Sequence, residues 1–126
     1  MIKIAGLVTV LVVASIILAA PAGISNQAQA KRGEAGYGKH CKECHDGGMG
    51  PSLKGDDFWS EWDQKMARPL YSTIISTMPQ DDPGSLPEKE VLDIVAYILQ
   101  LNGLPEGDKE IEKANELNTI KLERPK

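Results

Sequence analysis

The chain has 126 residues, 14 of them basic and 18 acidic, which gives a formal net charge of −4 at pH 7. Since a domain with a working hydrophobic core takes ~100 residues, this length leaves room for one domain and argues against two. The net negative charge argues against nucleic acid or an anionic membrane surface as the partner.

Residues 1–30 have the order that is typical of a secretory signal peptide. Lys3 is followed by an uncharged stretch, residues 4–20, and then by a polar run that ends in A-Q-A at residues 28–30. Because a signal peptidase admits only short side chains next to the cut, we expect cleavage before Lys31 and export to the periplasm. The alternative is an uncleaved membrane anchor, since an apolar stretch of 17 residues is close to the shortest helix that spans a bilayer.

The mature chain is expected to divide into a domain over residues 31–105 and a charged C-terminal extension over residues 106–126. Residues 31–54 contain five basic and three acidic residues, whereas residues 55–126 contain eight and fifteen. We interpret this as a solvated surface of mixed sign, with a mildly basic face beside residues 41–45 as the alternative. The extension is expected to lie along the surface of the domain or to be partly disordered.

The first predicted element of the mature chain is a short helix over residues 32–40. Gly33 and Tyr37 are four residues apart and share one face of it, where a glycine permits close contact with another helix. This helix leads directly into the sequence C-K-E-C-H at residues 41–45.

The two cysteines of the chain, Cys41 and Cys44, and the adjacent His45 match the C-x-x-C-H pattern of covalent haem attachment. Two thiols at this spacing on a helical turn can each bond to a vinyl group on the same edge of the porphyrin. The next residue then places its imidazole under the iron. The sequence therefore predicts one haem c, held by thioethers from both cysteines, with His45 as an axial iron ligand.

Other uses of a C-x-x-C pair fit this chain poorly. A structural zinc site needs four ligands, and the two histidines, His40 and His45, both lie in this segment. A thioredoxin-like redox site needs a βαβ context, which nothing near residue 41 indicates. A disulfide between residues so close in sequence would close too small a loop to stabilise much. We expect His40 to be exposed to solvent.

Three methionines follow in the chain, and geometry separates them as candidates for the sixth iron ligand. Met49 is too close to the ligand histidine, because a reach of at most ~14 Å cannot round the porphyrin edge. Met66 is expected to pack in the core, on the same helical face as Trp62. Met78 precedes Pro79, which favours an extended loop, and is the predicted ligand. A thioether ligand favours ferrous iron and raises the reduction potential.

The middle of the chain is predicted to be a loop followed by two helices. Residues 47–51 are rich in glycine and indicate a loop. The sequence S-E-W-D at residues 60–63 resembles a capping box, so a helix is expected to begin near residue 60. The R-P pair at residues 68–69 is expected to end that helix, and a further helix to run over residues 70–78.

The strongest periodic pattern of the chain predicts a final helix. Pro87 suits its first turn and Gly103 marks its end. No segment shows the alternation of a strand, so the expected fold class is all-α. The apolar stripe of the final helix consists of Val91, Ile94, Val95, Ile98 and Leu99.

Together these features resemble class I cytochromes c, a family of small all-helical proteins. The resemblance implies about four to five short helices around one covalently bound haem. It also implies that the Pro51 carbonyl accepts a hydrogen bond from Nδ1 of His45 and so sets the tautomer of the ligand. Pro87 departs from the family, which usually has Ser or Thr before the last helix. The similarity rests on Gly33, Tyr37 and residues 41–45, 50–53, 77–79 and 91–101.

Trp59, Trp62 and residues 77–86 are similar to a narrower group, the cytochrome c domains that work with quinoprotein (PQQ-dependent) alcohol dehydrogenases. This resemblance implies a quinoprotein dehydrogenase as electron donor and an oxidase or another cytochrome as acceptor. The predicted function is that of a periplasmic carrier of single electrons rather than an enzyme. Two alternatives stay open: a membrane-anchored haem subunit of a redox complex, and a haem sensor or enzyme with a displaceable sixth ligand.

Overall fold

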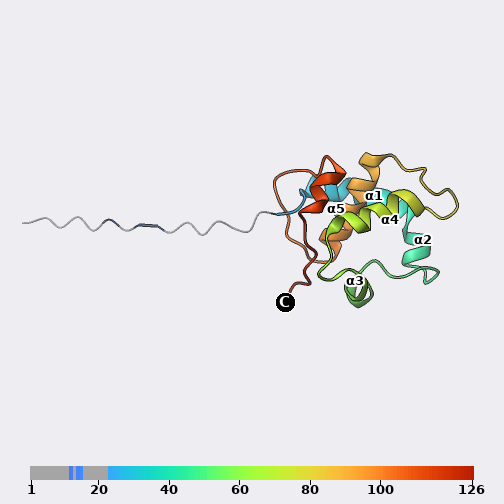
Figure 1. Cartoon of the computed structure of the whole chain (residues 1–126), viewed down its shortest axis with the longest axis horizontal. Helices are drawn as coiled ribbons and strands as arrows, with labels where there is room; N and C mark the ends of the chain where they lie inside the picture. Colours follow the sequence, from blue (N-terminus) through green and yellow to red (C-terminus); the bar gives the residue numbers. More distant parts are fainter. Residues whose placement is uncertain (1–11, 13, 16–22) are drawn as a thin grey trace, which may run out of the picture.

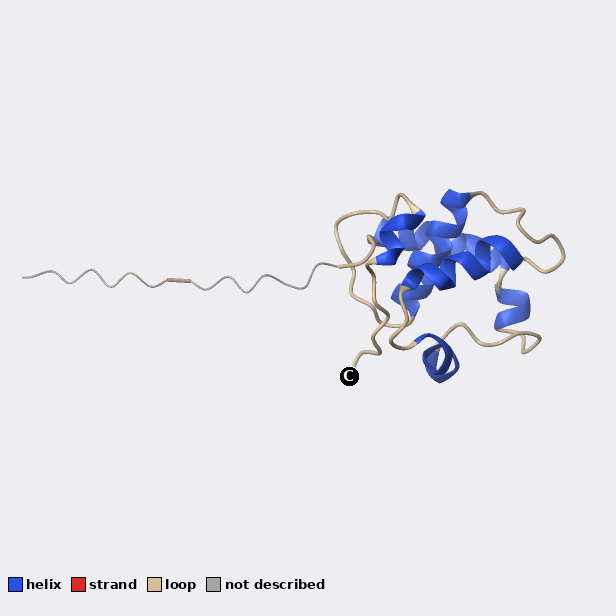
Figure 2. Ribbon diagram, in the orientation of Figure 1, coloured by secondary structure: helices blue, strands red, loops and turns tan. Residues whose placement is uncertain are grey.

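The computed structural model describes residues 12, 14–15 and 23–126, so most of the predicted signal peptide lies outside the described residues. Figure 1 shows the helices gathered into one body, and Figure 2 shows helices and loops alone among the described residues. The prediction of an all-α fold is confirmed. The helices are α1 (Gln27–His40), α2 (Lys42–His45), α3 (Gly55–Trp62), α4 (Ala67–Thr77), α5 (Glu88–Leu101) and the 3₁₀ helix η1 (Ala114–Asn118).

Helices α1 and α5 cross at very short range, and glycine makes this possible. A Cβ atom at Gly33 would lie 1.7 Å from the main-chain oxygen of Asp93, so no larger residue fits. One turn further along α1, the ring of Tyr37 packs against Tyr97 of α5 with centroids 5.2 Å apart. Near the crossing, Arg32 of α1 forms an ion pair with Asp93. The expected role of Gly33 in a helix contact is therefore confirmed.

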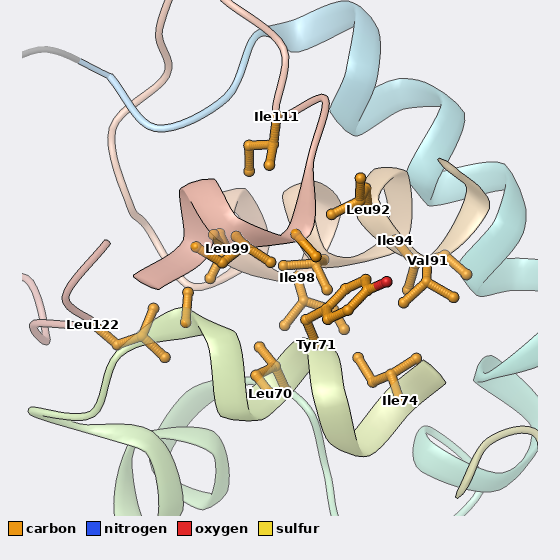
Figure 3. Close-up of a cluster of buried hydrophobic side chains, with 14 of the residues drawn as sticks. Leu70, Tyr71, Ile74, Val91, Leu92, Ile94, Ile98, Leu99, Ile111 and Leu122 are labelled. Carbon is orange, nitrogen blue, oxygen red and sulfur yellow. The ribbon is translucent and has the colours of Figure 1, made fainter. Parts of the chain in front are cut away.

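Helix α5 supplies the centre of the hydrophobic core. Its predicted apolar stripe is buried, and Figure 3 shows side chains of α4 facing it, among them Leu70, Tyr71 and Ile74. Glutamates in the first turn suit the positive end of the helix dipole. The helix ends at Leu101, and Gly103 just after it has a φ of 84°, the left-handed conformation that favours glycine after a helix.

Three helix starts differ from the sequence-based expectations, and α1 begins at Gln27, five residues before the expected start. Helix α3 begins at Gly55, and Ser60 lies inside it, where its hydroxyl donates to the carbonyl of Asp57 rather than capping a first turn. A residue far away in the sequence stabilises this start, because Oδ1 of Asn102 accepts the Gly55 N–H at 3.0 Å. Helix α4 begins before Pro69, which sits in the first turn, where a missing N–H costs nothing.

The C-terminal extension is an ordered part of the domain. It pairs with the connection between α3 and α4: Gln64 and Lys65 exchange main-chain hydrogen bonds of 2.7 and 2.8 Å with Leu122. The extension adds four buried apolar side chains to the core, so it covers the domain and is not loosely attached to it. These side chains are Ile111, Ala114, Leu117 and Leu122.

The segment before α1 lies beside the start of this extension. Ser25 forms a parallel bridge with Glu106, and Gln29 and Ala30 are buried. The cleavage that the sequence predicts before Lys31 would therefore fall within α1.

Candidate functional site

The C-x-x-C-H sequence forms a single helical turn at the end of α1. Cys41 ends α1, with its N–H donating to Tyr37 at 2.9 Å, and it also begins α2. The N–H of His45 donates to the Cys41 carbonyl at 3.0 Å, so the first cysteine and the histidine lie one turn apart. Both cysteines are free thiols, Cys41 half-buried and Cys44 exposed.

The environment of Cys41 disfavours thiolate chemistry. Burial, followed by the nearby carboxylates of Asp46 and Glu90, raises the pKa of this thiol to about 11. A redox dithiol works as a thiolate and sits where the thiol pKa is lowered. The raised pKa of Cys41 therefore argues against the thioredoxin-like alternative.

The His45 ring is held from one side by the glycine-rich loop. Its Nδ1 lies 2.6 Å from the carbonyl oxygen of Pro51. The loop folds back because the N–H groups of Met49 and Gly50 both donate to the Cys44 carbonyl. A carbonyl can only accept, so Nδ1 carries the proton, and in the neutral ring the free lone pair is on Nε2.

Met78 is the first residue after α4. Its N–H still donates to Ile74 at 3.0 Å, while its own backbone is extended, with φ −116° and ψ 154°. The side chain is half-buried and packs against the edge of the hydrophobic core. The chain therefore leaves the helix here and presents a thioether at the border of the core.

The other methionines have different positions. Met49 is 70% exposed, and Met66 is 43% exposed at the N-cap of α4. The prediction that Met66 packs in the core on the same helical face as Trp62 is wrong, because α3 ends at Trp62 and the two residues share no helix.

His40 also differs from its expected state. It was expected to be exposed, yet its side chain is 19% exposed and its Nε2 lies 2.9 Å from a carboxylate oxygen of Glu90 in α5. The close crossing of α1 and α5 brings this pair together, which residues 41–45 alone could not indicate.

Sequence reasoning missed two sets of polar contacts that support the site, those of the Tyr37 hydroxyl and of the Asn102 side chain. The Tyr37 hydroxyl donates to Asp46 at 2.7 Å and ties α1 to the residue after α2. Asn102 donates to the carbonyls of Leu53 and Ile98, each at 2.9 Å, and so fastens the loop after Pro51 to α5. The one available signal for Asn102 was its place before Gly103 at a helix end.

A comparison of the sequence with models of known protein families gave a match. The family described as cytochrome c oxidase, cbb3-type, subunit III matches residues 28–98, more than half of the chain. The chain belongs to this family. It is thus a c-type cytochrome with covalently bound haem c and a role in electron transfer. The match runs from the first turn of α1 into α5 and includes the whole C-x-x-C-H turn. Searches of curated proteins and of solved structures gave no match.

The described residues of this cytochrome fit such a group. The turn at residues 41–45 offers two free thiols and an imidazole of defined tautomer. A flat apolar macrocycle also needs apolar side chains that the core leaves partly uncovered. Several partly buried side chains pack against the edge of the core, among them Leu53, Trp62, Ile75 and Met78.

The described part of the cytochrome contains no helix with both the length and the apolar character needed to cross a membrane.

Proposed function

We propose that this cytochrome is an exported, periplasmic carrier of single electrons with one haem. In this proposal Cys41 and Cys44 hold the haem through thioethers, and His45 and Met78 are the axial iron ligands. The observation that carries it is the contact of 2.6 Å between His45 Nδ1 and the Pro51 carbonyl, which supports an Nε2 ready to bind metal. When bound, the haem supplies an iron that cycles between the ferric and ferrous states.

The chain's own residues hold and tune that iron. Pro51 keeps the His45 proton on Nδ1 and fixes the ring orientation, which leaves Nε2 to bind the metal. A thioether from Met78 would favour the ferrous state and place the potential in the range of an electron carrier. With His45 and Met78 both holding the iron, no position would remain for a substrate, and only electrons would be exchanged.

A quinoprotein (PQQ-dependent) alcohol dehydrogenase is the proposed donor, and an oxidase or another cytochrome is the proposed acceptor. The similarity of Trp59, Trp62 and residues 77–86 to dehydrogenase-associated cytochromes supports the donor. The family description, which names an oxidase subunit, supports the acceptor. That description also favours one second candidate, a haem subunit that stays bound to a membrane redox complex.

The ligand assignment is tested by comparing Met78→Ala with Met66→Ala, whose side chain is exposed at the start of the same helix. Met78→Ala should lower the midpoint potential, abolish the near-infrared band of methionine-bound ferric iron, and let carbon monoxide bind the ferrous form. Met66→Ala should leave all three properties unchanged. Wild-type protein that binds carbon monoxide readily would instead indicate a sensor or enzyme.

The partner assignment needs a separate experiment. Purified cytochrome should accept electrons from a quinoprotein alcohol dehydrogenase turning over its alcohol, and the reduced protein should be reoxidised by an oxidase. Failure of the first reaction alone would remove the proposed donor. Constant co-purification with an oxidase in detergent would favour the bound subunit over a diffusing carrier.

A further inference from the structure

The apolar stretch at residues 4–20 is followed by three places where small residues stand two apart. They are A-P-A at residues 20–22, G-I-S at residues 23–25 and A-Q-A at residues 28–30. Each satisfies the small-residue pattern that a signal peptidase needs before its cut. The pattern alone does not show which of the three sites is cut, but the structure from residue 23 onward favours one of them.

Gly23 is already part of the folded domain. A Cβ atom at Gly23 would lie 1.8 Å from the carbonyl oxygen of Glu106, and a Cβ atom at Gly107 would lie 2.4 Å from the Gly23 oxygen. Two main-chain segments that approach this closely accept glycine on both sides and no larger residue. The chain is thus built into the domain from Gly23 onward.

The next two residues continue this pairing. The Ile24 N–H donates to the Pro105 carbonyl at 3.0 Å, and the Gly107 N–H donates to the Ser25 carbonyl at 2.8 Å. Ser25 is 1% exposed. A cut after Ser25 would remove the whole of this contact and expose the start of the C-terminal extension.

A cut before Lys31 would cost more. It would remove Asn26, which caps α1 by accepting the Gln29 N–H at 2.8 Å. It would also remove Gln29, whose amide exchanges two hydrogen bonds with the main chain of Ile111. The buried N–H and carbonyl of Ile111 would then have no partner, which is costly for backbone groups away from water.

We infer that the export leader of this cytochrome is cut between Ala22 and Gly23, and that residues 23–30 stay with the mature domain. In this step water hydrolyses the amide bond, which leaves a carboxylate on Ala22 and an ammonium group on Gly23. The peptidase of the export machinery is the catalyst. The inference requires only export, so it holds whatever the electron donor and acceptor are.

The direct test is the N-terminus of the exported protein. The full precursor, Met1 to Lys126, is produced in a bacterium that matures c-type cytochromes, and the haem-loaded protein is purified and analysed by intact and peptide mass spectrometry. A chain that begins at Gly23 is the expected result. A chain that begins at Asn26 or Lys31, or one that retains Met1, would overturn the inference.

Two matched variants test which small residues are used. Ala20→Leu places a large apolar side chain at the third residue before the inferred cut, and Ala28→Leu does the same for the cut before Lys31, at an exposed position of α1. Ala20→Leu should abolish the Gly23 terminus, and Ala28→Leu should leave it unchanged. The reverse pattern would refute the inference. The visible spectrum of each purified variant reports the haem site separately, so failure of the proposed ligand set would not be mistaken for failure of the processing site.

Discussion

Gln29 and the main chain of Ile111 exchange two hydrogen bonds, each 2.8 Å long, although 82 residues separate them. The Gln29 amide donates to the Ile111 carbonyl and accepts the Ile111 N–H, and both residues are almost fully buried. A side-chain amide can satisfy both groups of a peptide unit at once. This pair joins the first turns of α1 to the C-terminal extension, so the two ends of the domain stabilise each other.

Gln29→Ala should destabilise the haem-loaded protein by about 2–3 kcal/mol, because it leaves a buried N–H and a buried carbonyl without partners. The free energy of unfolding in guanidinium chloride measures the effect. Gln27→Ala is the control, since Gln27 is exposed in the same helix. Equal stability of the two variants would show that the pair with Ile111 contributes nothing measurable.

Gly33→Ala and Gly38→Ala should change stability in opposite directions, although both lie in α1. At Gly33 a methyl group would meet the Asp93 carbonyl at 1.7 Å and force α1 away from α5, at a cost of about 3 kcal/mol or more. A Cβ atom added at Gly38 would meet nothing within 4 Å outside its own helix, so alanine should stabilise the helix by about 0.5–1 kcal/mol. Thermal unfolding of both variants checks the prediction, and a stable Gly33→Ala variant would contradict the close crossing.

Asn102→Ala should loosen the loop that follows Pro51, whose carbonyl contacts the His45 ring. The substitution frees the Leu53 carbonyl and the Gly55 N–H together, and a loss of about 2–4 kcal/mol is expected. Hydrogen exchange should increase first at residues 53–57. Asn115→Ala, at an exposed position of η1, is the control and should leave both stability and exchange unchanged.

Stability should fall as the pH rises above 10, the ordinary pKa of tyrosine. Burial, followed by the hydrogen bond to Asp46, raises the pKa of Tyr37 well above this value. The folded state therefore keeps a proton that the unfolded chain releases, so the contribution is complete below pH 10 and is lost above it. Tyr37→Phe should flatten this dependence in unfolding experiments, although Tyr71 and Tyr97, whose pKa values are also raised, keep part of it. An unchanged slope would contradict the assignment to Tyr37.

Local patterns in the sequence predicted much of the fold and of the candidate site. The spacing of Cys41, Cys44 and His45 is a property of one helical turn, so no distant residue was needed to identify it. The stripe from Val91 to Leu99 repeats with the period of a helix and has the burial that this period predicts. The all-α fold and the haem c follow from features of this short-range kind.

Other predictions failed because contacts between distant residues decided them. The S-E-W-D sequence resembled a helix start, yet α3 begins at Gly55, where Asn102 of another segment binds the first N–H. Met66 was placed in a helix with Trp62, but pairing between the extension and the α3–α4 connection separates them. His40 was expected to be exposed, but the crossing of α1 and α5 places it against Glu90 of α5.

The sequence by itself determined which groups can hold the haem, because attachment chemistry depends on neighbours a few residues apart. It also indicated an export leader, but left three small-residue sites after the apolar stretch. Only the tertiary structure showed that Gly23 belongs to the folded domain. There the main chains of Gly23 and residues 106–107 come so close that only glycine fits, and the Gln29 amide pairs with the main chain of Ile111. Such contacts leave no pattern in the sequence, because the two partners are far apart along the chain and neither has an unusual sequence around it.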